Sequence, residues 1–216
     1  MLTKLIPEKT IGRLSLYRRI LSDLSAQKID SIFSHQLAAL AGKTAAQVRR
    51  DLMNIGFSGS PTLGYDTANL VHQIGEYLDP PKTQNIAVIG VGNLGRALLS
   101  HFPTRRPNLS IVAAFDTDPG KTGRVIQGCH CYPLEKIAEV FAQKMIRVAI
   151  LAIPATEAQG VADMAIRAGA TGIMNFARVP LRVPAHVYVE NIDMTMSLEK
   201  VAFFARQRSP EKEEQK

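Results

Sequence analysis

Apolar side chains recur at helical spacing through the first 80 residues. The segment 10–24 carries one apolar stripe that repeats every three or four residues, which predicts a helix. Its members are Ile11, Leu14, Tyr17, Ile20, Leu21 and Leu24. We expect three more helices, at 34–41, from 44 to about 56, and at 67–78.

Residues suited to helix ends support these boundaries. Thr10 and Ser34 are suited to cap the first and second helices, and Gly42 is suited to end the second. Thr44 and Gln47 match the T-x-x-Q pattern of a capping box, which predicts the start of the third helix. The stretch GFSGSPTLGYD that follows is rich in Gly, Ser and Pro, and it predicts a turn or a short hairpin.

The pattern changes at DPPKTQ (79–84), where two prolines forbid a continuing helix. Beyond this segment, strands that are apolar on both faces alternate with helices, which is typical of a parallel sheet covered on both sides. We predict strands at 85–89, 110–115, 148–153, 172–176 and 187–191, and helices at 93–102, 133–144, 156–168 and 194–208. The expected fold class is α/β, with a helical domain at 1–80 and a doubly wound parallel sheet at 81–216.

Composition narrows the class of protein. The apolar content of 46% supports a core, and no run of about 18 apolar residues predicts a membrane span. The start of the chain has no apolar segment typical of a signal peptide, so we expect a cytoplasmic protein. Cys129 and Cys131 fit reduced thiols better than a disulfide framework, with a redox or metal role as the alternative. The net charge of +7 permits a nucleic-acid partner, but it is not concentrated in the helical domain.

Residues 90–95 read GVGNLG between a predicted strand and a predicted helix, the setting in which a glycine-rich turn binds a dinucleotide. Gly90 permits the tight turn, Gly92 the approach of the pyrophosphate, and Gly95 the close packing of helix on strand. Asp116 ends the next strand, where a carboxylate accepts hydrogen bonds from ribose hydroxyls and repels a 2′-phosphate. The predicted ligand is NAD(H), held by Gly90, Val91, Gly92, Asn93, Leu94, Gly95 and Asp116.

No catalytic set accompanies this motif in the sequence. The histidines of the second domain, His101, His130 and His186, are not paired with a carboxylate or a nucleophile, and hydride transfer has no visible general acid. The sheet and its helices leave almost no sequence for a substrate domain. We therefore expect a binding protein without a metal site and not an enzyme. An NAD-dependent oxidoreductase with an accessory helical domain is the alternative.

The helical domain has the organisation of a helix-turn-helix over about 17–56. In its third helix Val48 and Leu52 form the inner stripe, and polar side chains lie off it near the helix start, which enters a major groove in such motifs. Gln can pair with adenine, and Arg with guanine or phosphate. The turn that follows is placed to act as a wing. The predicted DNA contacts are Ser34, Thr44, Ala46, Gln47, Arg49, Arg50 and Ser60.

Together the two halves resemble the Rex family of redox-sensing bacterial transcriptional repressors. The motifs that carry the resemblance cover nearly the whole chain. In the N-terminal half they are RLSLYRRIL, SHQLAAL, TAAQVRRDLMNIG and LGYD. In the C-terminal half they are NIAVIGVGNLGRAL, IVAAFDTDPGKTG, AILAIPATEAQGVAD, GIMNFA and ENIDM.

The resemblance implies a homodimer with winged-helix N-terminal domains and Rossmann-like C-terminal domains, in which the last helix, here 194–208, is exchanged between subunits. It implies a repressor that binds a near-palindromic operator when NADH is scarce and releases it when NADH binds. Asp193, which we also count with the cofactor site, would pair with Arg19 of the first helix in the DNA-bound state. Near the ribose and the nicotinamide the resemblance places Ile153, Pro154, Ala155, Asn175 and Phe176.

Three positions depart from the family's pattern. His101, followed by Phe102, stands where the family commonly has a Tyr that reaches toward the nicotinamide, and either ring is a candidate substitute. Pro61 stands where the wing usually carries a basic residue, and Arg178 replaces the usual Pro after NFA. A second alternative also stays open: a DNA-binding regulator whose second domain binds another nucleotide, such as CoA, or serves only for dimerisation.

Overall fold

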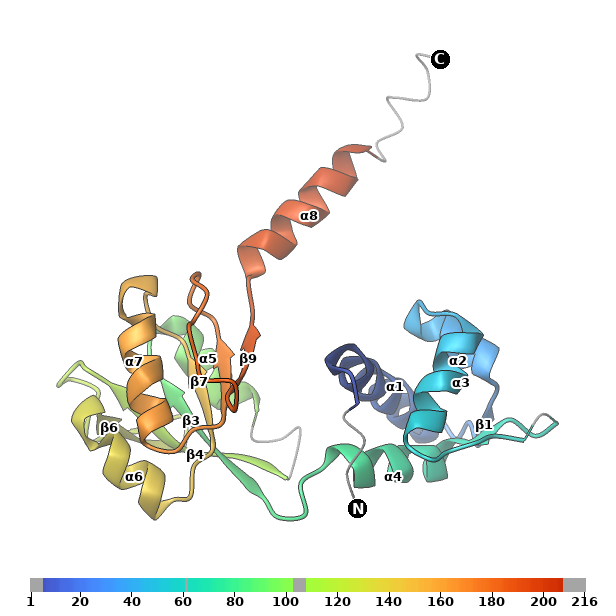
Figure 1. Ribbon diagram of the computed structural model, residues 1–216, viewed down its shortest axis with the longest axis horizontal. Coiled ribbons are helices and arrows are strands. Elements are labelled where there is room, and N and C mark those ends of the chain that lie inside the picture. Colours follow the sequence, from blue (N-terminus) through green and yellow to red (C-terminus); the bar gives the residue numbers. More distant parts are fainter. Residues whose placement is uncertain (1–5, 61, 103–107, 208–216) are drawn as a thin grey trace. The chain divides into compact units, whose positions relative to one another are not determined.

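The computed structural model describes residues 6–60, 62–102 and 108–207. Two of the positions singled out from the sequence, Pro61 and Arg208, lie outside the described residues. The chain divides into two compact units, Met1–Pro81 and Lys82–Lys216 (Figure 1). No helix in the described ranges is long and apolar enough to cross a membrane.

The first unit consists of four helices and a two-stranded ribbon. The helices are α1 (Glu8–Ala26), α2 (Ser34–Ala41), α3 (Ala45–Asn54) and α4 (Thr67–Leu78). The strands β1 (Ser31–Ile32) and β2 (Tyr65–Asp66) pair antiparallel. The sequence did not predict this ribbon, because strands of two residues are too short to show an alternating pattern. The helices are held together by one buried cluster that includes Leu14, Leu37, Val48, Leu52, Leu70 and Ile74.

The first two helices begin differently from the prediction. Pro7 precedes α1, and Thr10 is not a cap: it is buried within the first turn and accepts a hydrogen bond from Arg13 Nη2 at 2.9 Å. Phe33 precedes α2, so Ser34 is the first residue of that helix and not its cap. A fixed φ suits Pro to a helix start, which explains the earlier beginning of α1.

The turn between α2 and α3 is closer to the prediction. Gly42 ends α2 in the left-handed conformation with a φ of 61°, as expected. Thr44 caps α3, since its side chain accepts the N–H of Gln47 at 3.2 Å. The predicted capping box is nevertheless only half formed, because the side chain of Gln47 donates to Asp51.

After α3 the chain forms a compact hairpin, which confirms the predicted turn. The backbones of Ser60 and Gly64 exchange two hydrogen bonds, of 3.0 and 2.9 Å. The hydroxyl of Ser60 also accepts the N–H groups of Thr62 and Leu63. Gly64 has a φ of 75°, and a Cβ there would lie 2.7 Å from the carbonyl oxygen of Ile32. Glycine is therefore required where the hairpin meets β1.

The second unit is built on one seven-stranded sheet. The strand order is β5-β6-β4-β3-β7-β8-β9, and every neighbouring pair is parallel except β5 with β6. The strands are β3 (Gln84–Ile89), β4 (Leu109–Asp116), β5 (Val125–Ile126), β6 (Cys129–Pro133), β7 (Val148–Leu151), β8 (Gly172–Asn175) and β9 (Tyr188–Asn191). The helices are α5 (Asn93–His101), α6 (Ile137–Gln143), α7 (Ala155–Arg167) and α8 (Met194–Gln207), with a 3-10 turn η1 (Leu134–Lys136) before α6.

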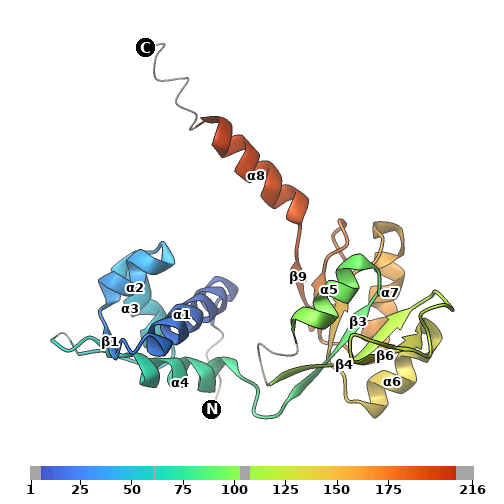
Figure 2. The same cartoon turned by 180° about the vertical axis from the view of Figure 1, so that it is seen from behind.

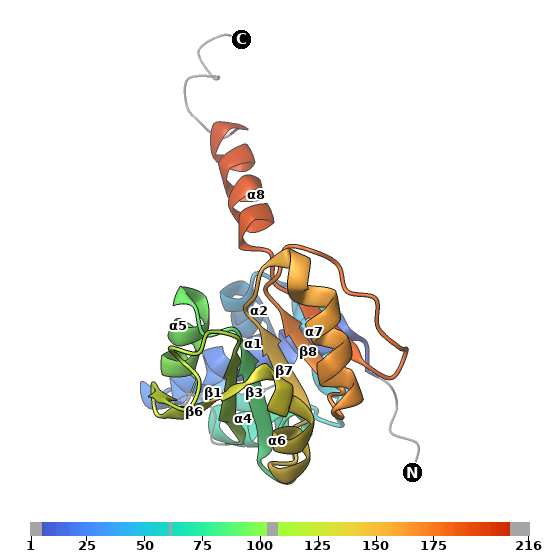
Figure 3. The same ribbon diagram turned by 90° about the vertical axis from the view of Figure 1, so that its left-hand side faces the viewer.

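Helices cover both faces of the central strands, as the two-sided apolar pattern predicted. Along β3, Ala87 and Ile89 pack toward α6 and α7, while Ile86 and Val88 pack on the face that Leu99 of α5 covers. Figures 2 and 3 show α5 on one side of the sheet and α6 with α7 on the other. The sequence missed β6, because GCHCYP carries polar residues and has no apolar run, and it missed β5 because that strand has only two residues.

The last helix, α8, differs from the other helices of this unit. None of its side chains is buried, although it carries six large apolar ones. The six are Met194, Met196, Leu198, Val201, Phe203 and Phe204.

Candidate nucleotide site and nucleic-acid interface

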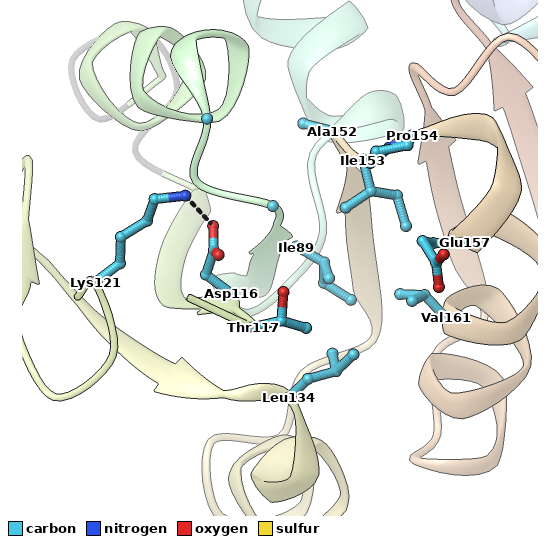
Figure 4. A pocket seen from close by; sticks show the side chains of 12 residues that line it. Ile89, Asp116, Thr117, Lys121, Leu134, Ala152, Ile153, Pro154, Glu157 and Val161 are labelled. Carbon is cyan, nitrogen blue, oxygen red and sulfur yellow. Dashed lines mark hydrogen bonds and ion pairs between the residues drawn. The ribbon is translucent and has the colours of Figure 1, made fainter. Parts of the chain in front are cut away.

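A pocket of about 440 Å³ opens at the carboxyl ends of β3, β4 and β7 (Figure 4). In the sheet, β3 lies between β4 and β7, so the chain order reverses at this place. Open α/β sheets bind their ligands in the crevice at such a switch point. Apolar side chains form much of the wall, among them Ile89, Leu134 and Val161.

The glycine loop forms one edge of this pocket. Gly90 has a φ of 94°, and a Cβ there would collide with the backbone of Ala152. A Cβ on Gly95 would collide with the carbonyl oxygen of Gly90, which explains why α5 can start so close to β3. Gly92 instead faces open space, since a Cβ there would meet nothing within 4 Å. A ligand can therefore approach the backbone at Gly92.

Gly92 is also the residue that precedes α5. Without a side chain it cannot accept hydrogen bonds from the first N–H groups of the helix. Asn93 and Leu94 lie in that first turn, where free N–H groups and the helix dipole favour an anion. The residues present therefore fit a pyrophosphate.

Asp116 lies at the end of β4 and lines the pocket. Its carboxylate accepts the N–H of Val91 at 2.8 Å and that of Asp118 at 2.9 Å. Burial opposes ionisation of this carboxyl group, but these hydrogen bonds and the neighbouring Lys121 outweigh it and lower its pKa. Asp116 is therefore an ionised acceptor beside the glycine loop, as the ribose of a dinucleotide requires.

Lys121 is a pocket residue that the sequence analysis missed. Its Nζ lies 3.1 Å from Asp116 Oδ2 and 3.6 Å from Asp118 Oδ2. Figure 4 shows Lys121 and Asp116 on one side of the pocket, with Ile153, Pro154 and Glu157 opposite. The signal was present in the sequence, since Lys121 lies five residues after Asp116 in FDTDPGK.

Only some of the other predicted cofactor residues line the pocket. Ile153 and Pro154 line the pocket, whereas His101 and Phe102 do not, their rings lying edge to face 5.5 Å apart at the far end of α5. Phe176, which follows β8, packs partly buried against the core on the α5 face.

Asn175 and Asp193 have roles within the fold. The amide of Asn175 is fully buried, donates to Val179 and Asn191, and accepts the N–H of Ala177. It fixes the loop after β8. Asp193 accepts the N–H of Met196 at 2.8 Å and thus stabilises the start of α8.

The first unit has a hollow of about 480 Å³ that brings several predicted DNA contacts together. Ser34 and Arg49 both line it, and Arg49 Nη1 donates to Ser34 Oγ at 2.9 Å. Ser60, from the hairpin, lines the same hollow. The start of α2, the exposed side of α3 and the hairpin therefore contribute one cation and two hydroxyls to a single concave surface.

The remaining predicted DNA contacts lie around the start of α3. Thr44, Ala46 and Arg50 are exposed. Gln47 is partly exposed, and its Nε2 donates to Asp51 Oδ1 at 2.9 Å.

Asp51 is a second residue that the sequence analysis missed. It is 1% exposed and binds Arg13 of α1 through two hydrogen bonds, of 2.6 and 2.7 Å. The hydroxyl of Tyr17 donates to the same carboxylate at 3.0 Å. The sequence did carry a signal, since Asp51 is adjacent to Leu52 and three residues after Val48, on the inner face of the helix.

Arg19, the predicted switch residue, is exposed on α1. The neighbouring Arg18 is buried and pairs with Asp79, with Nη1 2.6 Å from Oδ1. Asp79 directly follows α4, so this pair joins the end of the helical unit to its first helix.

Neither cysteine has the surroundings of a reactive thiol. Cys129 and Cys131 are free and buried on the α5 face of the sheet. Burial raises the pKa of Cys129 to about 11 and also raises that of Cys131. Within the described ranges, no group of three or more His, Cys, Asp or Glu side chains could hold a metal ion.

Two family models match the chain. Residues 5–52 match the family described as "Putative DNA-binding protein N-terminus", and residues 81–179 match the family described as "CoA binding domain". The two matches fall in the helical unit and in the sheet unit respectively.

The chain is similar to curated proteins over nearly its whole length. It is 40% identical over 199 residues to the redox-sensing transcriptional repressor Rex of Syntrophobacter fumaroxidans, covering 92% of this chain and 95% of that protein. It is 39% identical over 201 residues to Rex of Carboxydothermus hydrogenoformans, covering 93% of this chain and 97% of that protein. Both relatives are redox-sensing transcriptional repressors.

Solved structures agree with this assignment. The chain superimposes on RSP, a Rex-family repressor, in complex with β-NAD⁺ and operator DNA, with a TM-score of 0.87, 32% identity and 94% coverage of both chains. Its TM-score with RSP bound to β-NADH is 0.85, at 32% identity, with coverage of 94% of this chain and 96% of that one. The chain belongs to the Rex family of redox-sensing transcriptional repressors.

Proposed function

We propose that this protein is an NADH-responsive repressor. Its helical unit binds operator DNA when NADH is scarce, and NADH bound in the sheet unit causes release. The observation that carries the proposal is the joint presence of the pocket at the carboxyl ends of β3, β4 and β7 and the concave surface formed by Ser34, Arg49 and Ser60. One unit offers a dinucleotide site and the other a site for an anionic polymer.

The pocket suits NAD(H) by its chemistry. The start of α5 takes the pyrophosphate, and Asp116 accepts the hydrogen bonds of the adenosine ribose. Of the residues assigned to the cofactor, Gly90, Gly92, Ile153 and Pro154 line the pocket. The rest of the loop Gly90–Gly95 is proposed to bind the phosphates. Asn175, Phe176 and His101 or Phe102 do not line the pocket, and we propose them near the nicotinamide from the family resemblance alone. The nicotinamide supplies only its redox state as a signal, and no residue of this chain is assigned to proton or hydride transfer.

The helical unit, residues 1–80, suits a winged helix-turn-helix. In this arrangement α3 enters the major groove and the hairpin that contains Ser60 acts as the wing. Arg49 and Arg50 contact bases or phosphates together with Ser34, Thr44, Ala46 and Gln47. A single cation on the concave surface makes the contact salt-dependent, as is usual for phosphate neutralisation.

The second unit, residues 81–216, is also proposed to form a homodimer. The six exposed apolar side chains of α8 are more than a helix in water normally carries, and a second copy of the chain would cover them. We infer that α8 is exchanged between subunits. Two helical units then bind two half-sites of a near-palindromic operator.

Release requires that NADH binds the two dimer arrangements with different affinity. A ligand with equal affinity for both states would not shift the equilibrium, however tightly it bound. We propose that the exposed Arg19 and the half-buried Asp193 form an ion pair in the DNA-bound arrangement only. Such a pair biases the equilibrium toward binding until NADH favours the other state.

The match of residues 81–179 to a CoA binding domain favours the alternative of a regulator that senses another nucleotide. Equilibrium binding separates the two hypotheses. NADH, NAD⁺, NADPH and CoA are titrated into the purified protein. We expect NADH to bind most tightly. Tighter binding of CoA than of NADH would contradict the proposed ligand, and saturable binding of NADH without any duplex binding would contradict the proposed repressor.

A further inference from the structure

The buried carboxylate of Asp51 controls the orientation of one amide on α3. Asp51 is enclosed by donors: Arg13 Nε and Nη2 at 2.6 and 2.7 Å, and the Tyr17 hydroxyl at 3.0 Å. Burial opposes its ionisation, but the hydrogen bonds outweigh burial and lower its pKa. Asp51 is therefore an ionised group that only accepts hydrogen bonds.

Gln47 lies one helical turn before Asp51. Its amide nitrogen is 2.9 Å from Asp51 Oδ1. The opposite orientation would bring the amide oxygen against a carboxylate oxygen, with no proton between them. Asp51 therefore fixes the nitrogen of the half-buried Gln47 amide toward the buried carboxylate and turns its oxygen away from that carboxylate.

We propose that Asp51 is a positioning residue that makes Gln47 selective for a base, adenine or cytosine, that offers a hydrogen-bond donor in the major groove at the point of contact. The inference rests on the proposed function, in which α3 enters that groove. There, the amino groups of adenine and cytosine are donors, whereas guanine presents O6 and N7 and thymine presents O4 as acceptors. An outward amide oxygen accepts from adenine or cytosine and is repelled by the other two bases.

The experiment uses the full-length protein and a duplex that the wild type selects from random sequence. Each base pair of one half-site is then varied in turn, and binding is measured without NADH. We expect the wild type to prefer adenine or cytosine at one position by about tenfold, a modest part of the discrimination that good base contacts give. Gln47→Met, which has a similar length but no amide, is expected to lose this preference at that position alone.

Asp51→Asn gives the decisive result. Both carboxylate oxygens of Asp51 accept from Arg13, Oδ1 from Nη2 and Oδ2 from Nε, and Oδ1 also accepts from Gln47. The NH₂ group of Asn takes the place of either oxygen and faces an Arg13 donor in both cases, so the Gln47 amide is no longer held in one orientation. We expect the preference for adenine or cytosine at that position to be lost. Uniform weakening of all duplexes, with the wild-type preference retained, would overturn the inference.

Asp51→Asn also leaves Arg13 with a neutral partner and could unfold the unit. The double variant Arg13→Met with Asp51→Asn removes both charges, a replacement that buried ion pairs often tolerate. Here neither orientation of Gln47 is imposed, and we expect the preference to disappear. Retention of the wild-type preference in this variant would also overturn the inference.

Tyr17→Phe is the matched control, because it removes a donor from the same carboxylate without touching Gln47. We expect a lower melting temperature and an unchanged base preference. A change of preference as large as that of Asp51→Asn would show that loosened packing, and not amide orientation, is responsible, and would overturn the inference. Failure of the proposed function is distinguishable, because it appears in the wild type as absence of duplex selection.

Discussion

Lys121 and Asp116 form an ion pair at the edge of the nucleotide pocket, with Nζ 3.1 Å from Oδ2. The pair places a positive charge beside the carboxylate that is proposed to bind the adenosine ribose. Asp116 is the carboxylate nearest to the Lys121 ammonium group, and Oδ2 of Asp118 lies 3.6 Å from the same Nζ. We therefore expect the discrimination between NADH and NADPH to depend on Asp116 and Lys121.

Asp116→Ser is expected to reverse much of the preference for NADH. The variant loses the ribose acceptor, so NADH should bind about tenfold more weakly, as for a hydrogen bond to a charged group. NADPH should bind more tightly, because the repulsion of its 2′-phosphate disappears and Lys121 becomes available to it. Fluorescence titration of both nucleotides measures the ratio.

Asp118→Asn is the matched control for this change. It removes a carboxylate near Lys121 but leaves Asp116 in place, so the preference for NADH should persist. An unchanged NADH to NADPH ratio in Asp116→Ser would contradict the ribose role of Asp116.

Arg49→Ala should weaken operator binding and leave NADH affinity intact. Arg49 lies in the helical unit, whereas the nucleotide pocket lies in the sheet unit. Loss of the cation should reduce operator affinity by about tenfold or more and, where the contact is to phosphate, should lower the slope of log K against log salt by about 1. Arg124→Ala, an exposed arginine of the sheet unit, removes the same charge elsewhere. Equal losses in the two variants would mean that only net charge matters.

The two cysteines are expected to play no part in redox sensing. Because burial raises the pKa of Cys129 to about 11, little thiolate forms at neutral pH, and thiolate is the reactive species. Alkylation of the native protein should be far slower than alkylation of the unfolded chain. The variant with Cys129→Ala and Cys131→Ala should keep its response to NADH. A response to NADH that is lost in this variant, with folding retained, would restore a role for the pair.

The apolar side chains of α8 provide a test of the proposed dimer. Leu198 and Val201 are 68% and 65% exposed and lie one turn apart on the helix. Charged groups in their place should oppose burial against a second chain, so Leu198→Glu with Val201→Glu should sediment as a monomer. Operator affinity should fall, since two half-sites are no longer bound together. Glu199→Gln is the control on the same helix, and a dimer that survives the double change would contradict the role of α8.

The sequence was most informative where periodicity runs over many residues. The range of α4, Thr67–Leu78, was predicted without error, and most helices and central strands lie within a few residues of the prediction. Short elements escaped, because β1, β2 and β5 have two residues each and leave no periodic pattern.

In the candidate sites too, residues placed by local sequence spacing could be predicted, and residues placed by tertiary packing could not. The glycine loop and Asp116 could be predicted because local spacing determines their place after a strand. The contacts of Lys121 with Asp116 and of Arg13 with Asp51 could not, since they depend on how a loop folds back and on how α1 packs against α3. Arg13 and Asp51 are 38 positions apart, and only the packing of α1 on α3 brings them together.

The central claim is that NADH and operator DNA oppose each other on one protein. The most direct measurement is the affinity of the wild-type protein for its selected duplex at saturating NADH and at saturating NAD⁺, at one salt concentration. We expect binding with NADH to be weaker by at least about tenfold, which corresponds to a coupling free energy of about 1.4 kcal/mol. Equal affinity in the two nucleotides would contradict the account.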